Sequence, residues 1–261
     1  MFESVKELFF YKGMTRSLVK REVRGRYKGS MMGFLWNFIT PLVQIAVYIM
    51  IFKMIFRVDI EHYEIYIIVG MIPWIFLSES MISGSGSIVS NSNMVTKIYF
   101  PRSVLPISSV LSKLVNFLIS TVIEIAIILI SGYGLDPLLL LLFPLYTLLF
   151  MMAITGVTLI LSAINTYLRD VEYITNVAMM VLVWLTPVMY MRSMSEEGSL
   201  MAFVLNVNPA TYYIEMFQSL FYYQTLPETF TFVFCVVFSF AILVIGWIIF
   251  HRLERDFAEV L

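Results

Sequence analysis

The sequence predicts an all-α integral membrane protein. It is expected to have six transmembrane helices, an N-terminal amphipathic interface helix, and a re-entrant helical hairpin between the fifth and sixth spans. Three observations support this fold class. The 261-residue chain is 60% hydrophobic and 13% charged, its charges fall in short interruptions between long apolar runs, and its basic residues gather in alternate interruptions. Lipid offers no partner for backbone N–H and C=O groups, so runs of about 20 apolar residues must cross a bilayer core of roughly 30 Å as helices.

Six apolar runs meet the length that a helical crossing requires. They cover residues 33–56, 65–88, 107–130, 138–164, 173–190 and 229–250. Four of them contain a proline that is expected to kink the helix, at Pro41, Pro73, Pro144 and Pro187. An even number of crossings places both termini on one side of the membrane.

The distribution of lysine and arginine sets the orientation, because positively charged loops stay in the cytoplasm. The leader and the loops on its side hold Lys6, Lys12, Arg16, Lys20, Arg21, Arg24, Arg26, Lys28, Lys97, Arg102, Arg169, Arg252 and Arg255. The opposite loops hold only Lys53, Arg57 and Arg192. Both termini are therefore expected to be cytoplasmic. The net charge of -1 gives no reason to expect a nucleic-acid partner or an acidic one.

The first 32 residues form a basic leader. They lack the apolar core and small-residue cleavage site of a signal peptide, so the leader is expected to be retained. Ser4 and Glu7 have the spacing of a capping box, and Val5, Leu8 and Phe9 form the apolar face of a helix expected to lie in the membrane interface.

A second helical piece is expected over residues 17–27, where basic side chains recur every four residues. This stretch is either a docking or substrate-handling element or a basic flank that only fixes the orientation.

The interruption at residues 90–102 reads SNSNMVTKIYFPR. Asn91 and Asn93 can cap a helix, Met94 and Ile98 belong to an apolar face, and Pro101 prevents continuation of the helix. A short cytoplasmic helix is expected, either as a contact surface or as a plain connector. The loop at residues 165–173 is shorter and mixed in charge, and it suggests a second, smaller contact.

Between the fifth and sixth spans, residues 199–226 are too apolar for a solvated loop and too broken for another crossing. Asn208 and Pro209 separate two apolar runs, at 200–207 and 212–223, whose lengths suit re-entrant or interfacial helices. The hairpin is expected to dip back from the outer face and to line the outer end of a pathway. The alternative is a plug that only packs against the bundle.

Charged residues inside the expected spans are few: Glu79, Lys113 and Glu124. Such residues normally face a bundle interior, a partner or a cavity. Lys113 and Glu124 are 11 residues apart and therefore share one helical face. The three residues mark a candidate polar pathway, unless neighbouring helices satisfy each of them or Lys113 reaches the cytoplasmic edge.

The sequence carries no signature of an enzyme. It has no nucleotide-binding GxxxxGK[ST] loop, no HExxH and no GxSxG. A single cysteine, Cys235, and two histidines in loops on opposite faces exclude an intrachain disulfide and a multi-histidine metal site. Uphill transport by this chain would draw its energy from an ion gradient or from another subunit.

Three segments together carry a family resemblance: LVKREVRGRYKGSMMGFLWNFITPL at residues 18–42, KIYFPR at 97–102, and NPATYYIEMFQSLFYY at 208–223. They resemble the permease subunit of ABC-2 type exporters of lipid-linked polysaccharides, such as O-antigen and teichoic-acid exporters. The resemblance covers essentially the whole chain. It implies a leader at residues 1–32 followed by a single transmembrane domain at 33–261.

The resemblance implies a homodimer in a bacterial plasma (inner) membrane, working with two copies of a cytoplasmic ABC ATPase that binds the ATP and Mg²⁺. This chain is then expected to hold no cofactor and to have no enzymatic activity. The substrate is expected to be an undecaprenyl-linked glycan, O-antigen first and teichoic acid or capsule next. It would enter from the cytoplasmic leaflet near the first and fifth spans.

The resemblance also implies roles for individual residues. Contact with the ATPase is expected at Met94, Lys97, Ile98, Tyr99, Phe100 and Arg102. The interface helix is expected to use Val5, Leu8 and Phe9. The outer gate is expected at Asn208, Pro209, Tyr212, Tyr213 and Phe217.

Three other functions are consistent with parts of the pattern. An ABC-2 permease for a drug or a small lipid has the same topology, with a narrower passage. An intramembrane acyl- or glycosyltransferase needs a polar catalytic cluster at one face, and a secondary transporter usually shows an internal repeat and more intramembrane ionisable groups. The isolated charges and the lack of a repeat disfavour the last two.

Overall fold

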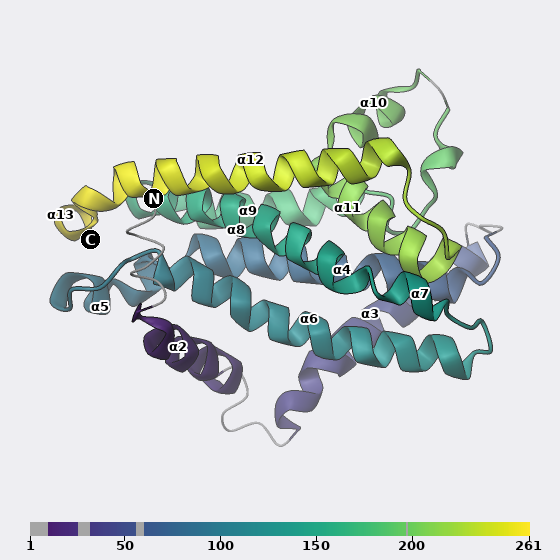
Figure 1. Cartoon of the computed structure of the whole chain (residues 1–261), viewed down its shortest axis with the longest axis horizontal. Coiled ribbons are helices and arrows are strands. Elements are labelled where there is room, and N and C mark those ends of the chain that lie inside the picture. Colours follow the sequence, from purple (N-terminus) through teal and green to yellow (C-terminus); the bar gives the residue numbers. More distant parts are fainter. Residues whose placement is uncertain (1–9, 26–31, 56–59, 197) are drawn as a thin grey trace.

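The computed structural model describes residues 10–25, 32–55, 60–196 and 198–261. Within these ranges the chain is helical, and it contains no strand. The long helices run side by side along the longest axis of the molecule (Figure 1). The α5 end of this bundle carries α5, α13 and the C-terminus, and the α10 end carries α7 and α10 (Figure 1).

Among the described residues, four helices are long and apolar enough to cross a membrane. They are α4 (Tyr63–Ser85), α6 (Val104–Ile130), α8 (Phe143–Tyr167), which extends a span that begins with α7 (Pro137–Leu140), and α12 (Thr229–Leu253). They correspond to the second, third, fourth and sixth expected spans. Pro73 lies inside α4, whereas Pro144 lies in the first turn of α8, where proline needs no N–H partner. Pro144 therefore lies at the start of α8, directly after the break between α7 and α8 at residues 141–142.

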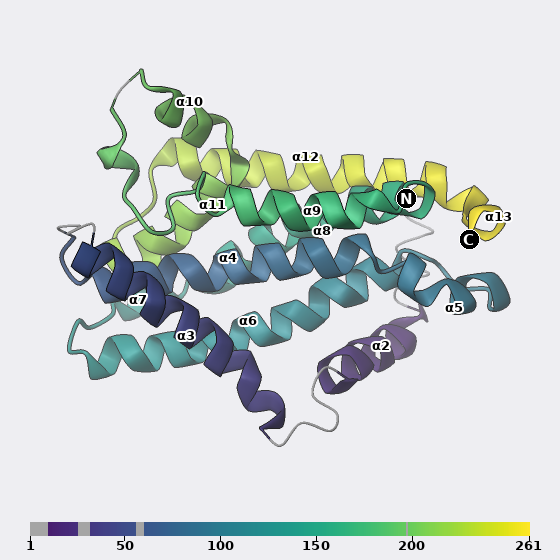
Figure 2. The same ribbon diagram turned by 180° about the vertical axis from the view of Figure 1, so that it is seen from behind.

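The first expected span is built from three pieces. A 3₁₀ turn at Gly33–Leu35 leads into α3 (Trp36–Met50), which ends in a π-helical turn at Ile51–Ile55. α3 contains Pro41, packs against α4, and runs obliquely to the long helices (Figure 2).

The fifth expected span is helical only in its first half. α9 (Asp170–Leu182) is about 20 Å long at 1.5 Å per residue, and Pro187 lies in the irregular stretch that follows it. Side chains from elsewhere satisfy the carbonyls of this stretch. The donors are the Tyr63 hydroxyl to the Met189 carbonyl at 2.8 Å, the Tyr66 hydroxyl to the Tyr190 carbonyl at 2.8 Å, the Gln218 amide to the Pro187 carbonyl at 2.8 Å, and the Asn208 amide to the Leu185 carbonyl at 2.9 Å. Irregular backbone at membrane depth is tolerated where protein covers it in this way.

The segment before α12 forms two short helices, as the sequence predicts. α10 (Leu200–Val207) and α11 (Pro209–Gln218) meet at Asn208, whose side chain accepts a hydrogen bond from the Ala210 N–H at 3.0 Å. α11 continues into a π-helical turn at Ser219–Tyr223. α11 packs against α4, α8 and α12, whereas α10 projects from the bundle (Figure 1).

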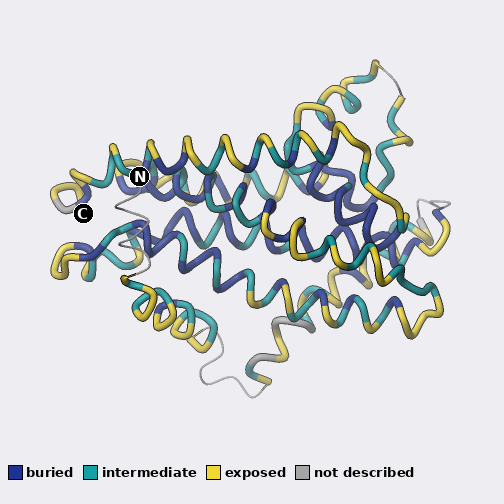
Figure 3. The backbone as a smooth tube through the Cα atoms, viewed as in Figure 1, coloured by how far each residue is buried: buried dark blue, intermediate teal, exposed yellow. Residues whose placement is uncertain are grey.

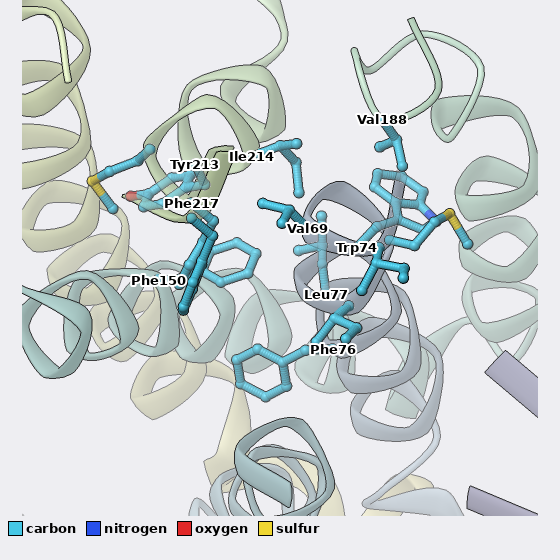
Figure 4. Close-up of a cluster of buried hydrophobic side chains, with 14 of the residues drawn as sticks. Val69, Trp74, Phe76, Leu77, Phe150, Val188, Tyr213, Ile214 and Phe217 are labelled. Carbon is cyan, nitrogen blue, oxygen red and sulfur yellow. The ribbon is translucent and has the colours of Figure 1, made fainter. Parts of the chain in front are cut away.

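The core follows α4, which is the most deeply buried helix (Figure 3). The main hydrophobic cluster joins α4, α6, α8, α11 and α12, and includes Val69, Phe76, Phe150, Tyr213 and Phe217 (Figure 4). A second cluster lies at the α5 end, and it includes Phe100, Leu105, Leu159, Phe250 and Phe257.

α8 and α12 form the closest helix pair, and they meet at two glycines. A methyl group on Gly156 would lie 2.5 Å from the Ile242 carbonyl oxygen, and one on Gly246 would overlap the Gly156 carbonyl. The two helices therefore touch backbone to backbone, which small residues permit in a membrane bundle.

Candidate functional site

The segment at residues 90–102 forms a short helix at the α5 end, and its side chains divide between two surroundings. η3 (Val89–Asn91) leads into α5 (Ser92–Lys97), after which the chain is extended. Ile98 and Tyr99 are 60% and 93% exposed, whereas Phe100 is 5% exposed and belongs to the second core cluster. Of the apolar residues expected to contact a partner, Ile98 and Tyr99 thus face outward and Phe100 faces inward.

The polar residues of this segment also divide. Lys97 is exposed. The Arg102 guanidinium donates a hydrogen bond to the Glu254 carbonyl and lies 5.9 Å from the centre of the Phe257 ring. Met94 is half-buried and packs against the second core cluster. Arg102 and Met94 therefore make contacts inside the chain.

The loop between α8 and α9, taken here as residues 165–173 from the last turn of α8 to the first turn of α9, adds exposed apolar groups near the same end. Leu168 and Tyr173 are 63% and 73% exposed. The loop itself is held by the Asn165 side chain, whose oxygen accepts a hydrogen bond from the Glu172 N–H at 2.9 Å.

The leader is described only in part. Val5, Leu8 and Phe9 lie outside the described residues. α2 (Lys12–Gly25) confirms a helix over most of the second expected piece, with Leu18 buried on one face. Its exposed side chains include a stripe of basic residues at Lys12, Arg16, Lys20 and Arg24.

The structure brings Glu79 and Lys113 together and adds an acidic residue from α2. The Lys113 ammonium lies 3.5 Å from the Glu22 carboxylate and 3.9 Å from the Glu79 carboxylate. The Ser83 hydroxyl donates to the Glu22 carboxylate at 3.0 Å. Lys113 is buried, whereas the two carboxylates are about one-third exposed. The cluster therefore ties α2, α4 and α6 together.

Two cavities meet at this cluster. One of about 630 Å³ lies among α2, α4, α6 and α9, and one of about 330 Å³ lies among α3, α4 and α6. They share Glu79 and Lys113, so they are described together as the polar cleft. The smaller cavity is also lined by Gln44, Asn116 and Ser120. The cleft offers hydroxyl, amide and charged groups between helices that are otherwise apolar.

Glu124 does not line the polar cleft. It is buried on the face of α6 that turns inward, and one of its carboxylate oxygens has no hydrogen-bond partner among the described residues. Lys113 and Glu124 were expected to share one polar face of α6. Lys113 lines the polar cleft and Glu124 does not, because different neighbouring segments cover α6 at the two positions.

At the α10 end, the expected gate residues lie inside the chain. Tyr213 donates to or accepts from the Ser239 hydroxyl and stacks on Phe150 with a centroid distance of 5.0 Å. Phe217 is equally buried beside Phe150, and the Tyr212 hydroxyl donates to the Asn206 carbonyl at 2.7 Å. Asn208 and Pro209 form the corner between α10 and α11. These contacts fix the hairpin against the bundle, and whether it also gates a pathway stays a prediction.

An ion pair stabilises this corner. The Arg192 guanidinium lies 3.1 Å from the Glu215 carboxylate and 5.5 Å from the centre of the Tyr212 ring. Burial raises the pKa of Glu215, while the neighbouring Arg192 acts in the opposite direction.

Sequence reasoning missed Glu22 and the intrachain role of Arg102. Glu22 is the acidic residue of an otherwise basic α2, and it lies one turn after the buried Leu18. This spacing was the available signal, because it places the carboxylate on the buried face. Across the described residues, no group of three or more His, Cys, Asp or Glu side chains could hold a metal ion.

Comparison with known proteins agrees with this architecture. Residues 14–222 match the family described as ABC-2 type transporter. An O-antigen export system permease protein, RfbA, of Myxococcus xanthus is 33% identical over 260 residues, which cover 99% of each chain. Two proteins of the same description from Klebsiella pneumoniae are 31% and 29% identical over 208 and 207 residues, which cover 78% of each chain.

Proposed function

Because this chain belongs to the ABC-2 type transporter family, we propose that it is the permease subunit of an ATP-driven polysaccharide exporter. The cargo is a lipid-linked polysaccharide, O-antigen first and teichoic acid or capsule next, carried from the cytoplasmic to the outer side of the plasma membrane. The observation that carries the proposal is the 33% identity to an O-antigen export permease over 99% of both chains. The chain is the membrane part, and a separate ABC ATPase supplies ATP hydrolysis with its own Mg²⁺.

The proposed topology has six crossings with both termini in the cytoplasm. Four crossings are the long helices α4, α6, α7–α8 and α12. The other two use α3 with its flanking turns, and α9 with the irregular stretch that follows it. The side-chain hydrogen bonds to that stretch support its burial at membrane depth. Basic residues at the leader and the α5 end support a cytoplasmic position for that end.

The ATPase is proposed to dock on the segment at residues 94–102. The support is local: the extended chain after the short helix α5 presents Ile98 and Tyr99 outward, on a backbone anchored by buried Phe100. Aromatic side chains that stand free of their own chain are typical anchors at protein interfaces.

The working unit is proposed to be a homodimer with two ATPase subunits. α9 supports it, because it leaves an apolar stripe exposed that includes Val177, Met180 and Val181. ATP binding closes the ATPase pair, the docked segments follow, and the helices move as rigid bodies between closed and open arrangements. The undecaprenyl-linked glycan enters near the first and fifth spans, the polar cleft is one candidate surface for its polar part, and the hairpin at residues 199–226 acts as the outer gate.

Deletion of the gene in its own cell tests the function. Loss of surface polysaccharide is expected, with the lipid-linked polymer accumulating inside, and wild-type complementation restores export. The measurement is immunoblotting of surface glycan together with extraction of lipid-linked glycan. Unchanged surface polysaccharide with altered sensitivity to a drug would instead favour the small-molecule permease.

A further inference from the structure

The chain ends in a short turn that is tied to the bundle. η6 (Glu254–Asp256) and α13 (Phe257–Val260) follow α12 directly, and they are here called the C-terminal turn. Phe257 in this turn is 0% exposed and meets Phe250 of α12 edge to face at 5.6 Å between ring centres.

The C-terminal turn holds the loop that contains α5. Arg102 donates a hydrogen bond to the Glu254 carbonyl, and its guanidinium lies 5.9 Å from the centre of the Phe257 ring. α13 also packs against α5 itself. A charged hydrogen bond and a cation–π contact thus fix the point at which the extended chain after Tyr99 returns to the bundle.

The same turn holds the loop between α8 and α9. The Tyr167 ring lies 6.0 Å from the Phe257 ring between centres, and the Tyr167 hydroxyl donates to the carbonyl of Leu253, the last residue of α12 before the turn, at 2.8 Å. Phe257 therefore touches one residue from each of the two loops. Both α5 and α13 lie at the same end of the molecule (Figure 1).

We infer that the C-terminal turn is a positioning element that joins both loops, through Arg102, Tyr167 and Phe257, into one docking platform. Ile98 and Tyr99 stand on one loop and Leu168 and Tyr173 on the other, and all four are exposed. Fixing both loops before binding lowers the ordering cost of association. The fixed loops also transmit a displacement of Tyr99 to α12 through Phe257 and Phe250. A loop without these contacts would move without displacing α12. This inference rests on the proposal that an ATPase docks at residues 94–102.

The first test needs no ATPase. Spin labels are placed at Tyr99→Cys and Tyr173→Cys in a Cys235→Ala background, and the distance between them is measured by double electron–electron resonance. A narrow distribution is expected, and Arg102→Ala or Phe257→Leu should broaden it. Arg102→Lys, which keeps a cation and a donor, should restore much of the narrow distribution, and Val260→Ala is the matched control because Val260 is 42% exposed in the same turn. An unchanged distribution in Arg102→Ala would overturn the inference.

The second test measures ATPase affinity and glycan export per ATP hydrolysed in reconstituted vesicles. Arg102→Ala is expected to weaken ATPase binding about tenfold, because the lost contacts lie inside the permease and reach the ATPase only as the cost of ordering the loop on binding. Export per ATP should fall with it, and Arg102→Lys should recover most of both. Tyr99→Ala separates the two proposals. If Tyr99→Ala binds the ATPase as wild type does, the docking proposal fails; if only Tyr99→Ala weakens binding, the positioning role of the C-terminal turn fails alone.

Discussion

The Tyr99→Ala variant is expected to lose most ATP-driven export. Its thermal unfolding temperature is expected to equal that of the wild-type permease. Tyr99 is 93% exposed, so truncating it removes little internal packing. A tyrosine that anchors an interface typically contributes about 2 kcal/mol or more, which corresponds to roughly thirtyfold weaker ATPase binding. Thermal unfolding of the purified permease and ATP-dependent export in vesicles measure the two effects separately.

Phe100→Ala is the matched variant, because Phe100 is the next residue along the chain and its side chain points inward. Phe100 is 5% exposed within the second core cluster, and removing such a ring costs about 3–5 kcal/mol of folding free energy. We expect it to lower the unfolding temperature clearly. Equal destabilisation by Tyr99→Ala would show that the Tyr99 ring is packed, and undiminished export from that variant would contradict the docking role.

Gly246→Ala is expected to destabilise the permease severely, and Gly246→Val to prevent its recovery in folded form. Any β-carbon at Gly246 overlaps the Gly156 carbonyl. Because this carbonyl belongs to the backbone of α8, the overlap is relieved only if α8 and α12 move apart. Overpacking a close contact costs about 1–3 kcal/mol and occasionally more, and this contact is backbone against backbone. The measurements are yield after detergent extraction and the temperature of thermal unfolding.

Gly13→Ala provides the control for that substitution. A methyl group at Gly13 meets nothing within 4 Å, and alanine favours the helix of α2 by up to about 1 kcal/mol. The control should unfold at or above the wild-type temperature. If Gly246→Ala unfolds there too, α8 and α12 are not in backbone contact at this point.

The long helices could be predicted because length and hydrophobicity alone decide whether a segment can cross a bilayer. The end of α9 could not. The carbonyls after Leu182 are satisfied by Tyr63, Tyr66 and Gln218, which come from helices far away in the sequence. A local apolar pattern carries no information about such distant donors, so residues 183–190 looked like more helix.

The polar residues show the same limit. An intramembrane charge predicts a partner without naming it, and Lys113 pairs with Glu79 as well as with Glu22 of the leader. The apolar run after Lys97 predicts a segment with an apolar surface, but it does not tell which side chains are buried: Ile98 and Tyr99 face outward, whereas Phe100 packs into the second core cluster. Arg102 was expected at a partner's surface, and the structure shows it bound to the C-terminal turn.

Accessibility of residue 99 tests the central claim most directly, because a cytoplasmic motor can act only on a cytoplasmic segment. A membrane-impermeant maleimide is applied to right-side-out and inside-out vesicles that carry Tyr99→Cys in the Cys235→Ala background. Phe203→Cys, at a 64% exposed position of α10, is the control for the outer face. We predict that residue 99 reacts only in inside-out vesicles and is protected by added ATPase, whereas residue 203 reacts only in right-side-out vesicles. Labelling of residue 99 in right-side-out vesicles would contradict the account.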